Sequence, residues 1–174
     1  MSTQPSQGFP KILLVGTTVF QRDARWSQLS HHGFTCIPVD KKQFSPDSAV
    51  VSEAHAVIYQ AGSKQSGTIA MLDALADRQS DLCLILVGPD AKADTVAQYL
   101  RRGAFDYLKW PCTNSRLLDS VTSGLHNRQA FLEVRTLSGD LASANTALAR
   151  ERDALKQLNQ RLAGLNKLTQ ADRK

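Results

Sequence analysis

Five short apolar runs, separated by segments with helical spacing, constrain the fold of this chain more than any other feature of its sequence. The runs lie at Lys11–Gly16, Phe34–Val39, Ala54–Gln60, Leu82–Gly88 and Ala104–Trp110. Continuous apolar runs of this length are typical of strands that are covered on both faces. Strands that alternate with helices predict crossover connections between parallel strands. The sequence therefore predicts an α/β protein with a doubly wound parallel sheet.

The segments between these runs support the same fold. Helical spacing is present over Arg22–His32, Ser66–Arg78 and Asp90–Arg102, and Asp90 is the predicted N-cap of the last helix. Residues 40–53 are polar and predict a helix that is short or poorly formed. In open sheets of this kind, ligands bind beyond the carboxyl ends of the strands. Any chemistry is therefore expected in the residues that follow each apolar run.

The most specific pattern lies in the stretch GAFDYLKWPC at residues 103–112. It follows the order GAxDYLxxP through Gly103, Ala104, Asp106, Tyr107, Leu108 and Pro111. With the alternation of strands and helices over residues 10–125, this stretch resembles the receiver domains of bacterial response regulators. The resemblance implies a flavodoxin-like (βα)5 sheet with the strand order 2-1-3-4-5. Pro38, in the second run, is consistent with a strand at the edge of that sheet.

Receiver domains carry a phosphorylation pocket, and the resemblance identifies its positions in this chain. In the family an acidic pair holds Mg²⁺, an aspartate accepts the phosphoryl group, and a hydroxyl residue and a lysine bind its oxygens. The corresponding residues here are Gly16 and Thr17, Gln60, Val87, and Trp110, which precedes Pro111. Mg²⁺ needs hard oxygen ligands, and a glutamine amide is not a nucleophile. We therefore expect a degenerate pocket, with no catalytic residue, no metal and no cofactor.

Two neighbouring residues of the fifth strand need separate interpretations. A shift of one position would make Lys109 the missing lysine, but alternate side chains of a strand face opposite ways, so we expect Lys109 to face away from Trp110. Tyr107 occupies the position of an aromatic residue that rotates inward on phosphorylation in the family. It is otherwise a half-exposed strand aromatic. The family's usual output surface predicts a partner-binding face that carries Tyr99, Arg101, Arg102, Asp106 and Tyr107.

A long helical segment follows the receiver-like region. A fifth helix is predicted to begin near residues 113–115, and no proline follows Pro111. One stripe with alternating spacings of three and four residues predicts a coiled-coil core, made of Val134, Leu137, Leu141, Ala144, Leu148, Glu151, Leu155, Leu158, Leu162 and Leu165. The alternative is an amphipathic helix that folds back on its own domain. We expect a parallel homodimer, with a flexible tail at 1–10, a receiver-like domain at 11–125 and a coiled-coil helix at 126–174.

Charge and cysteine content narrow the class of protein further. The formal net charge is +5, and from Leu125 onward nine Lys and Arg stand against five Asp and Glu. Such a modest excess along a helix is typical of a solvated face and does not favour nucleic-acid binding. Three separated cysteines form neither a metal-binding pattern nor a disulfide framework. No apolar run suits a membrane span or a signal peptide, so we expect a cytoplasmic location.

The sequence favours one function and leaves two others open. We expect a pseudo-receiver that acts without phosphorylation, as a dimeric signalling and protein-interaction module rather than an enzyme, with a protein as its signalling partner. The first alternative is the N-terminal regulatory part of a larger output protein, such as a kinase, a cyclase or a phosphodiesterase. The second is an RNA-binding regulator of the antitermination type, which would need a further small helical domain.

Overall fold

The computed structural model describes residues 8–76 and 81–171, with side chains as far as residue 164. Most of the predicted flexible tail (residues 1–7) and the end of the helix predicted over 66–78 lie outside the described residues. Eleven elements are present in the described part of the chain. In order they are β1 (Lys11–Gly16), α1 (Thr18–Gln21), α2 (Arg25–His31), β2 (Thr35–Asp40), α3 (Ala49–Ser52), β3 (Ala56–Gln60), α4 (Gln65–Ala76), β4 (Cys83–Gly88), α5 (Ala93–Arg101), β5 (Asp106–Lys109) and α6 (Asn114–Ala171).

The five strands form one parallel sheet, and their order confirms the predicted fold. The order is β2-β1-β3-β4-β5, which is the predicted 2-1-3-4-5. Strand β2 lies at the edge, where Pro38 stands opposite Leu14 in the register. Near the carboxyl ends of β3 and β4, Gln60 of β3 stands opposite Val87 of β4. The carboxyl ends of the strands therefore bring the predicted pocket residues to one edge of the sheet.

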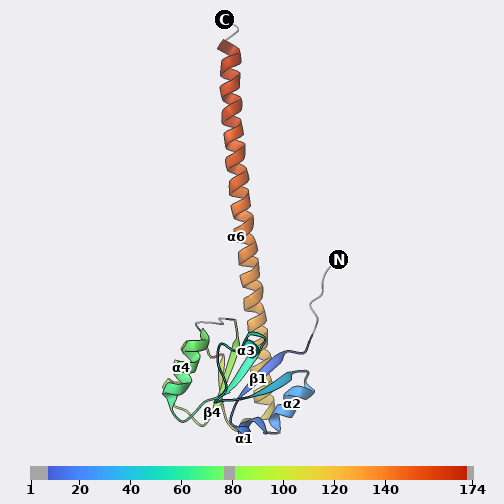
Figure 1. The fold of residues 1–174 in the computed structure, drawn as a ribbon, viewed down its shortest axis with the longest axis vertical. Coiled ribbons are helices and arrows are strands. Elements are labelled where there is room, and N and C mark those ends of the chain that lie inside the picture. Colours follow the sequence, from blue (N-terminus) through green and yellow to red (C-terminus); the bar gives the residue numbers. More distant parts are fainter. Residues whose placement is uncertain (1–7, 77–80, 172–174) are drawn as a thin grey trace. The chain divides into compact units, whose positions relative to one another are not determined.

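Alternating side chains place the core on both faces of the sheet. Ile12 and Leu14 of β1 pack on one face with residues of α1, α2 and the first turns of α6. Leu13 and Val15 pack on the other face with residues of α3, α4 and α5. Figure 1 shows α2 and α4 on opposite sides of the strands. This two-sided burial explains why the strands appear as continuous apolar runs in the sequence.

The structure differs from the prediction at the start of two helices. A short helix, α1, follows β1, and the Thr17 hydroxyl caps it by accepting a 3.4 Å hydrogen bond from the Phe20 backbone N–H. The prediction that Asp90 caps the helix after β4 is wrong. That helix begins at Ala93 with Lys92 as its N-cap residue, and the Asp90 carboxylate pairs with the Lys109 ammonium instead.

The chain divides into two compact units. The first ends at Ala130, five residues beyond the boundary expected from the sequence, and Arg128, past that boundary, is still partly buried. The second unit runs from Phe131 to the end of the chain and contains the rest of α6. None of the helices in the described ranges is long and apolar enough to cross a membrane.

Candidate functional site

Three residues of the predicted pocket meet where β1 and β3 end. The Thr17 backbone N–H donates a 2.8 Å hydrogen bond to Oε1 of Gln60. A Cβ atom placed on Gly16 would lie 2.8 Å from the same oxygen and would overlap the ring of Phe20. The Gln60 amide and the Phe20 ring thus occupy the space that a carboxylate side chain at position 16 would need.

These residues do not fit a magnesium ion or a phosphoryl group. Mg²⁺ prefers octahedral oxygen ligands, usually including carboxylates, and Gly16, Thr17 and Gln60 supply no charge. Asp23, the nearest carboxylate along the chain, forms an ion pair of 2.7 Å with Arg25. Within the described residues, no group of three or more His, Cys, Asp or Glu side chains is placed to hold a metal ion.

Trp110 belongs to an aromatic cluster, which we define as Phe20, Trp26 and Trp110. The Trp110 ring stacks on Trp26 with centroids 5.0 Å apart and planes 8° from parallel. Phe20 lies 4.8 Å from Trp26 and 5.5 Å from Trp110 between ring centroids. On Trp110 the Arg25 guanidinium carbon lies 5.0 Å from the ring centroid, a cation–π arrangement. The Trp110 side chain is therefore packed against three neighbours, and it fills this position with protein atoms.

A lysine that the sequence analysis missed lies beside Gln60. The Lys41 ammonium donates a 2.8 Å hydrogen bond to the Gln60 carbonyl oxygen and lies 4.7 Å from the centroid of the Tyr59 ring. Burial lowers the pKa of Lys41 below its ordinary value. Its position in the sequence, directly after β2, could have pointed to this contact, because the carboxyl end of β2 lies beside that of β1. The Lys41 ammonium therefore contacts the end of β3.

Val87 and its neighbour Gly88 differ in what they contact. The Val87 side chain is fully buried, on the face of the sheet that packs against α2 and α6. A Cβ atom on Gly88 would lie 2.6 Å from the Tyr107 hydroxyl oxygen and 3.1 Å from the Ala61 Cβ. Sequence reasoning did not single out Gly88, although a glycine that ends a buried strand marks a close approach. The missing side chain leaves the room that the Tyr107 hydroxyl occupies.

Tyr107 is held by contacts on two sides. Its hydroxyl donates a 2.7 Å hydrogen bond to the Pro89 carbonyl oxygen, and its ring stacks on Tyr99 with centroids 5.8 Å apart. Burial, with smaller contributions from Tyr99 and Asp90, raises the pKa of Tyr107. Lys109 is exposed and pairs with Asp90 at 2.9 Å, on the strand position that alternates with Trp110. The Trp110–Pro111 peptide bond is cis.

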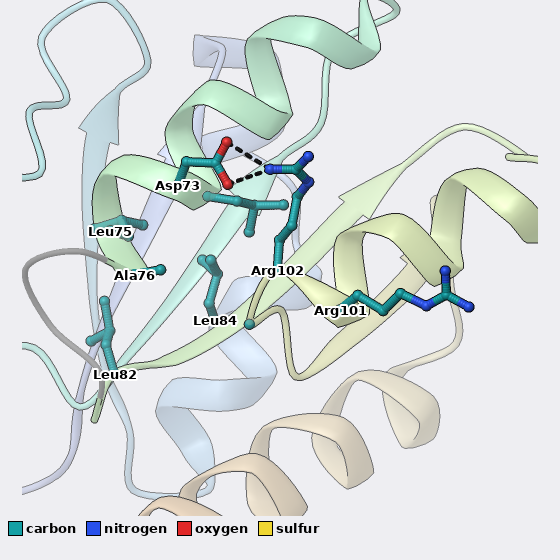
Figure 2. A pocket seen from close by; sticks show the side chains of 9 residues that line it. Asp73, Leu75, Ala76, Leu82, Leu84, Arg101 and Arg102 are labelled. Atoms are coloured by element: carbon teal, nitrogen blue, oxygen red, sulfur yellow. Dashed lines mark hydrogen bonds and ion pairs between the residues drawn. The ribbon is translucent and has the colours of Figure 1, made fainter.

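Not all of the residues predicted for a partner-binding face are free to contact a partner. Tyr99 is only 3% exposed, because its ring packs in the core beside Tyr107, so it is not a surface residue. The Asp106 carboxylate accepts hydrogen bonds of 2.8 Å from both Arg116 and the Ser120 hydroxyl. Arg102 pairs with Asp73 of α4, whereas Arg101 points away from that pair (Figure 2).

A cavity of about 480 Å³ lies between α4, α5 and the start of β4. Leucines supply its apolar lining, and Asp73, Arg101 and Arg102 supply its polar lining (Figure 2). Leu82 and Leu84 line it from the amino end of β4, whereas Gly16, Gln60 and Trp110 lie at the carboxyl ends of their strands. The cavity is therefore separate from the predicted pocket.

Comparison with known proteins supports one family. No family model matches the chain. The chain is 34% identical over 98 residues to the C4-dicarboxylate transport transcriptional regulatory protein DctD of Pseudomonas aeruginosa, a match that covers 56% of this chain and 20% of DctD. This chain therefore matches about a fifth of the length of that relative.

Solved structures agree with this relative. NtrX from Brucella abortus in complex with ADP superposes with a TM-score of 0.60 at 24% identity, over 73% of this chain and 28% of NtrX. A CheY-like response regulator receiver domain protein from Methanospirillum hungatei superposes with a TM-score of 0.55 at 14% identity, over 70% of this chain and 98% of that protein. The sheet, its strand order and the solved structures show a receiver-like (CheY-like) fold, and the chain is similar in sequence to part of one transcriptional regulatory protein, DctD.

Proposed function

We propose that this receiver domain works without phosphorylation, as a protein-interaction module that dimerises through its C-terminal helix. The observation that carries the proposal is the filling of the family's phosphorylation pocket by the protein's own side chains. Phe20 and the Gln60 amide fill the space beside Gly16, and Trp110 is stacked in the aromatic cluster. A phosphoryl group placed there would have neither a carboxylate to carry it nor a metal ion to neutralise it.

The cations around the pocket support the same proposal. Lys41 is engaged by the Gln60 carbonyl and the Tyr59 ring, Lys109 by Asp90, and Arg25 by Asp23 and Trp110. Each of these interactions would have to be broken before the cation could bind phosphoryl oxygens. The arrangement fits a structural role for these charges and not an anion-binding role.

The contacts of Tyr107 support a single conformation of the partner-binding face. Its hydroxyl occupies the space left by Gly88 and is hydrogen-bonded to Pro89, and its ring lies on Tyr99. Because both the hydroxyl and the ring of Tyr107 are already in contact with the protein, no bound ligand is needed to hold this side chain in place. We infer that the surface of α5, β5 and the first turns of α6 is presented to a protein partner in one conformation. On that surface Arg101 is exposed, whereas Tyr99 is buried and Arg102 is paired with Asp73.

The tail supplies the proposed dimer interface. Its predicted core residues are exposed on the single chain, with Val134 63%, Leu141 63% and Leu155 56% exposed. The others whose side chains are described, namely Leu137, Ala144, Leu148, Glu151, Leu158 and Leu162, are exposed as well, and the Leu165 side chain lies outside the described residues. A long apolar stripe exposed to water favours association, because burying it stabilises the assembly. We propose a parallel homodimer with residues 126–174 as the coiled-coil segment.

A second function is favoured by the lengths of the relatives. The chain covers 20% of DctD and 28% of NtrX, so in those proteins the matching region is one part of a longer chain. The same receiver and helix could therefore serve as the regulatory part of a larger output protein. In either case we place its action in the cytoplasm, on the basis of the response-regulator relatives.

Incubation with a phosphoryl donor tests the main proposal. With Mg²⁺ and acetyl phosphate, we expect the intact mass of the protein to stay unchanged, because position 60 has no carboxylate to phosphorylate. We also expect no change in tryptophan fluorescence, since Trp26 and Trp110 lie in the aromatic cluster at the pocket and would report its occupation. A receiver domain with an intact acidic pocket, treated in the same way, controls for the donor. One phosphoryl group per chain would overturn the proposal.

A further inference from the structure

The coiled-coil stripe contains one charged residue. In heptad terms, Val134, Leu141, Leu148, Leu155 and Leu162 occupy the first core position, a. The second core position, d, holds Leu137, Ala144, Glu151 and Leu158 among residues with described side chains. A carboxylate at a core position costs stability when no opposite charge is near, so its surroundings in a dimer decide how the helices can pair.

The helix itself provides no partner for Glu151 at the usual spacing. Positions three and four residues away carry Ala147, Leu148, Ala154 and Leu155, so none of them supplies a cation. Arg152, the next residue, occupies heptad position e at the border of the stripe. Its guanidinium forms an ion pair of 3.4 Å with Asp153 on the same helix, and its side chain remains 79% exposed. Glu151 and Arg152 are thus opposite charges that are available to a second helix.

We propose that Glu151 and Arg152 fix the tail dimer as parallel and in register, an inference that rests on the proposed dimer function. In a parallel pair, a side chain at d enters a hole formed by the partner helix's a, d, e and next a residues. For Glu151 these are Leu148, Glu151, Arg152 and Leu155 of the second copy. Each Glu151 therefore meets the Arg152 of the other chain, and the two-fold symmetry forms the pair twice.

Other arrangements of the same stripe lose this pairing. In an antiparallel dimer, Glu151 lies opposite Leu141 or Leu148, depending on the register, and Arg152 lies opposite Ser138 or Asn145. A parallel dimer shifted by one heptad places asparagine, Asn145 or Asn159, at the e position beside Glu151. The remaining e and g positions offer no complementary charge pairs for a parallel dimer. In the antiparallel register that sets Glu151 opposite Leu148, Asp140 and Arg161, both at g, face each other as opposite charges. The parallel, in-register dimer is therefore marked by the Glu151–Arg152 pairs, and its antiparallel alternative by Asp140 and Arg161.

Charge reversal at Arg152 tests the proposal in the full chain. Arg152→Glu places four carboxylates in one layer, so we expect the dimer Kd from sedimentation equilibrium to rise by about tenfold or more. Arg150→Glu is the matched control: it changes the charge equally, but at position c on the outer side, and we expect a change below about twofold. The exchanged pair Glu151→Arg with Arg152→Glu restores opposite charges, so its Kd should return toward that of the wild type.

A distance measurement reads the orientation directly. Spin labels are attached to Gln160→Cys, on the outer side of the helix, in a full chain whose native Cys36, Cys83 and Cys112 are replaced by alanine. Parallel pairing predicts labels within about 20 Å, whereas antiparallel pairing separates them by about 30 Å or more along the axis. Distant labels in a dimer, or equal effects of Arg152→Glu and Arg150→Glu, would overturn this inference and leave the dimer standing. A monomeric wild type would overturn the dimer function as well.

Discussion

Replacing Trp110 with lysine, the family's residue at that position, is expected to lower the free energy of unfolding by about 2–4 kcal/mol. Trp110 stacks on Trp26 and contacts Phe20, and these contacts would be lost. The new ammonium would also lie beside the Arg25 guanidinium, which now stacks on the Trp110 ring. The substitution should not restore phosphorylation, because Gly16, Thr17 and Gln60 would still provide no carboxylate.

Urea denaturation followed by circular dichroism measures this effect, and intact mass after acetyl phosphate treatment measures phosphorylation. Lys109→Ala is the neighbouring control. It removes only an exposed pair with Asp90, so we expect a loss below about 1 kcal/mol. A Trp110→Lys protein that is as stable as the wild type, or that becomes phosphorylated, would show that the aromatic cluster does not close the pocket.

Placing lysines in the tail stripe is expected to convert the dimer into a monomer. Leu148→Lys with Leu155→Lys removes four leucine side chains from the dimer interface, at about 1.5–3 kcal/mol for each buried leucine. The dimer Kd should therefore rise at least about a thousandfold. Both leucines are exposed on the single chain, at 63% and 56%, so the stability of the first unit should not change.

Light scattering coupled to size-exclusion chromatography gives the mass of each variant. Thr146→Lys with Gln160→Lys serves as the control, since it adds the same charges at outward heptad positions, and it should remain dimeric. The expectation fails if the double leucine variant stays dimeric at micromolar concentration, or if the wild type is monomeric there.

The fold follows closely from the sequence because its strands are buried on both faces. Buried strands such as Cys83–Gly88 leave a continuous apolar signal, and the order of strands follows from the family that residues 103–111 resemble. Helix ends were less predictable. Asp90 has the chemistry of an N-cap, but its ion pair with Lys109 of β5 is a tertiary contact that local sequence does not encode.

The candidate site was predictable in its positions but not in its packing. Gly16, Gln60 and Trp110 could be placed at one edge of the sheet, because parallel strands bring their carboxyl ends together. The position of the Phe20 ring could not be inferred, since it depends on the short helix α1 that the sequence analysis did not predict. Lys41 reaches Gln60 from a different strand, and Gly88 matters only through Tyr107, so both required three-dimensional contacts.

The surface residues were the least predictable part. Tyr99 and Arg102 have the composition of a partner-binding face, but side-chain direction decides whether they can serve in one. Tyr99 turns inward onto Tyr107, and Arg102 turns across to Asp73 of the neighbouring helix (Figure 2). Whether a side chain at the border of the core faces a partner or its own protein can be decided only when the neighbouring elements are in place.

We propose that this protein dimerises without any phosphoryl signal, and sedimentation equilibrium tests that proposal most directly. The dimer Kd of the full chain is measured with and without Mg²⁺ and beryllofluoride, which mimics a phosphoryl group on an aspartate. Because Phe20, Gln60 and Trp110 fill the pocket, the two constants are predicted to be equal. A shift of about fivefold or more, the size of a typical coupling between two sites, would contradict the account.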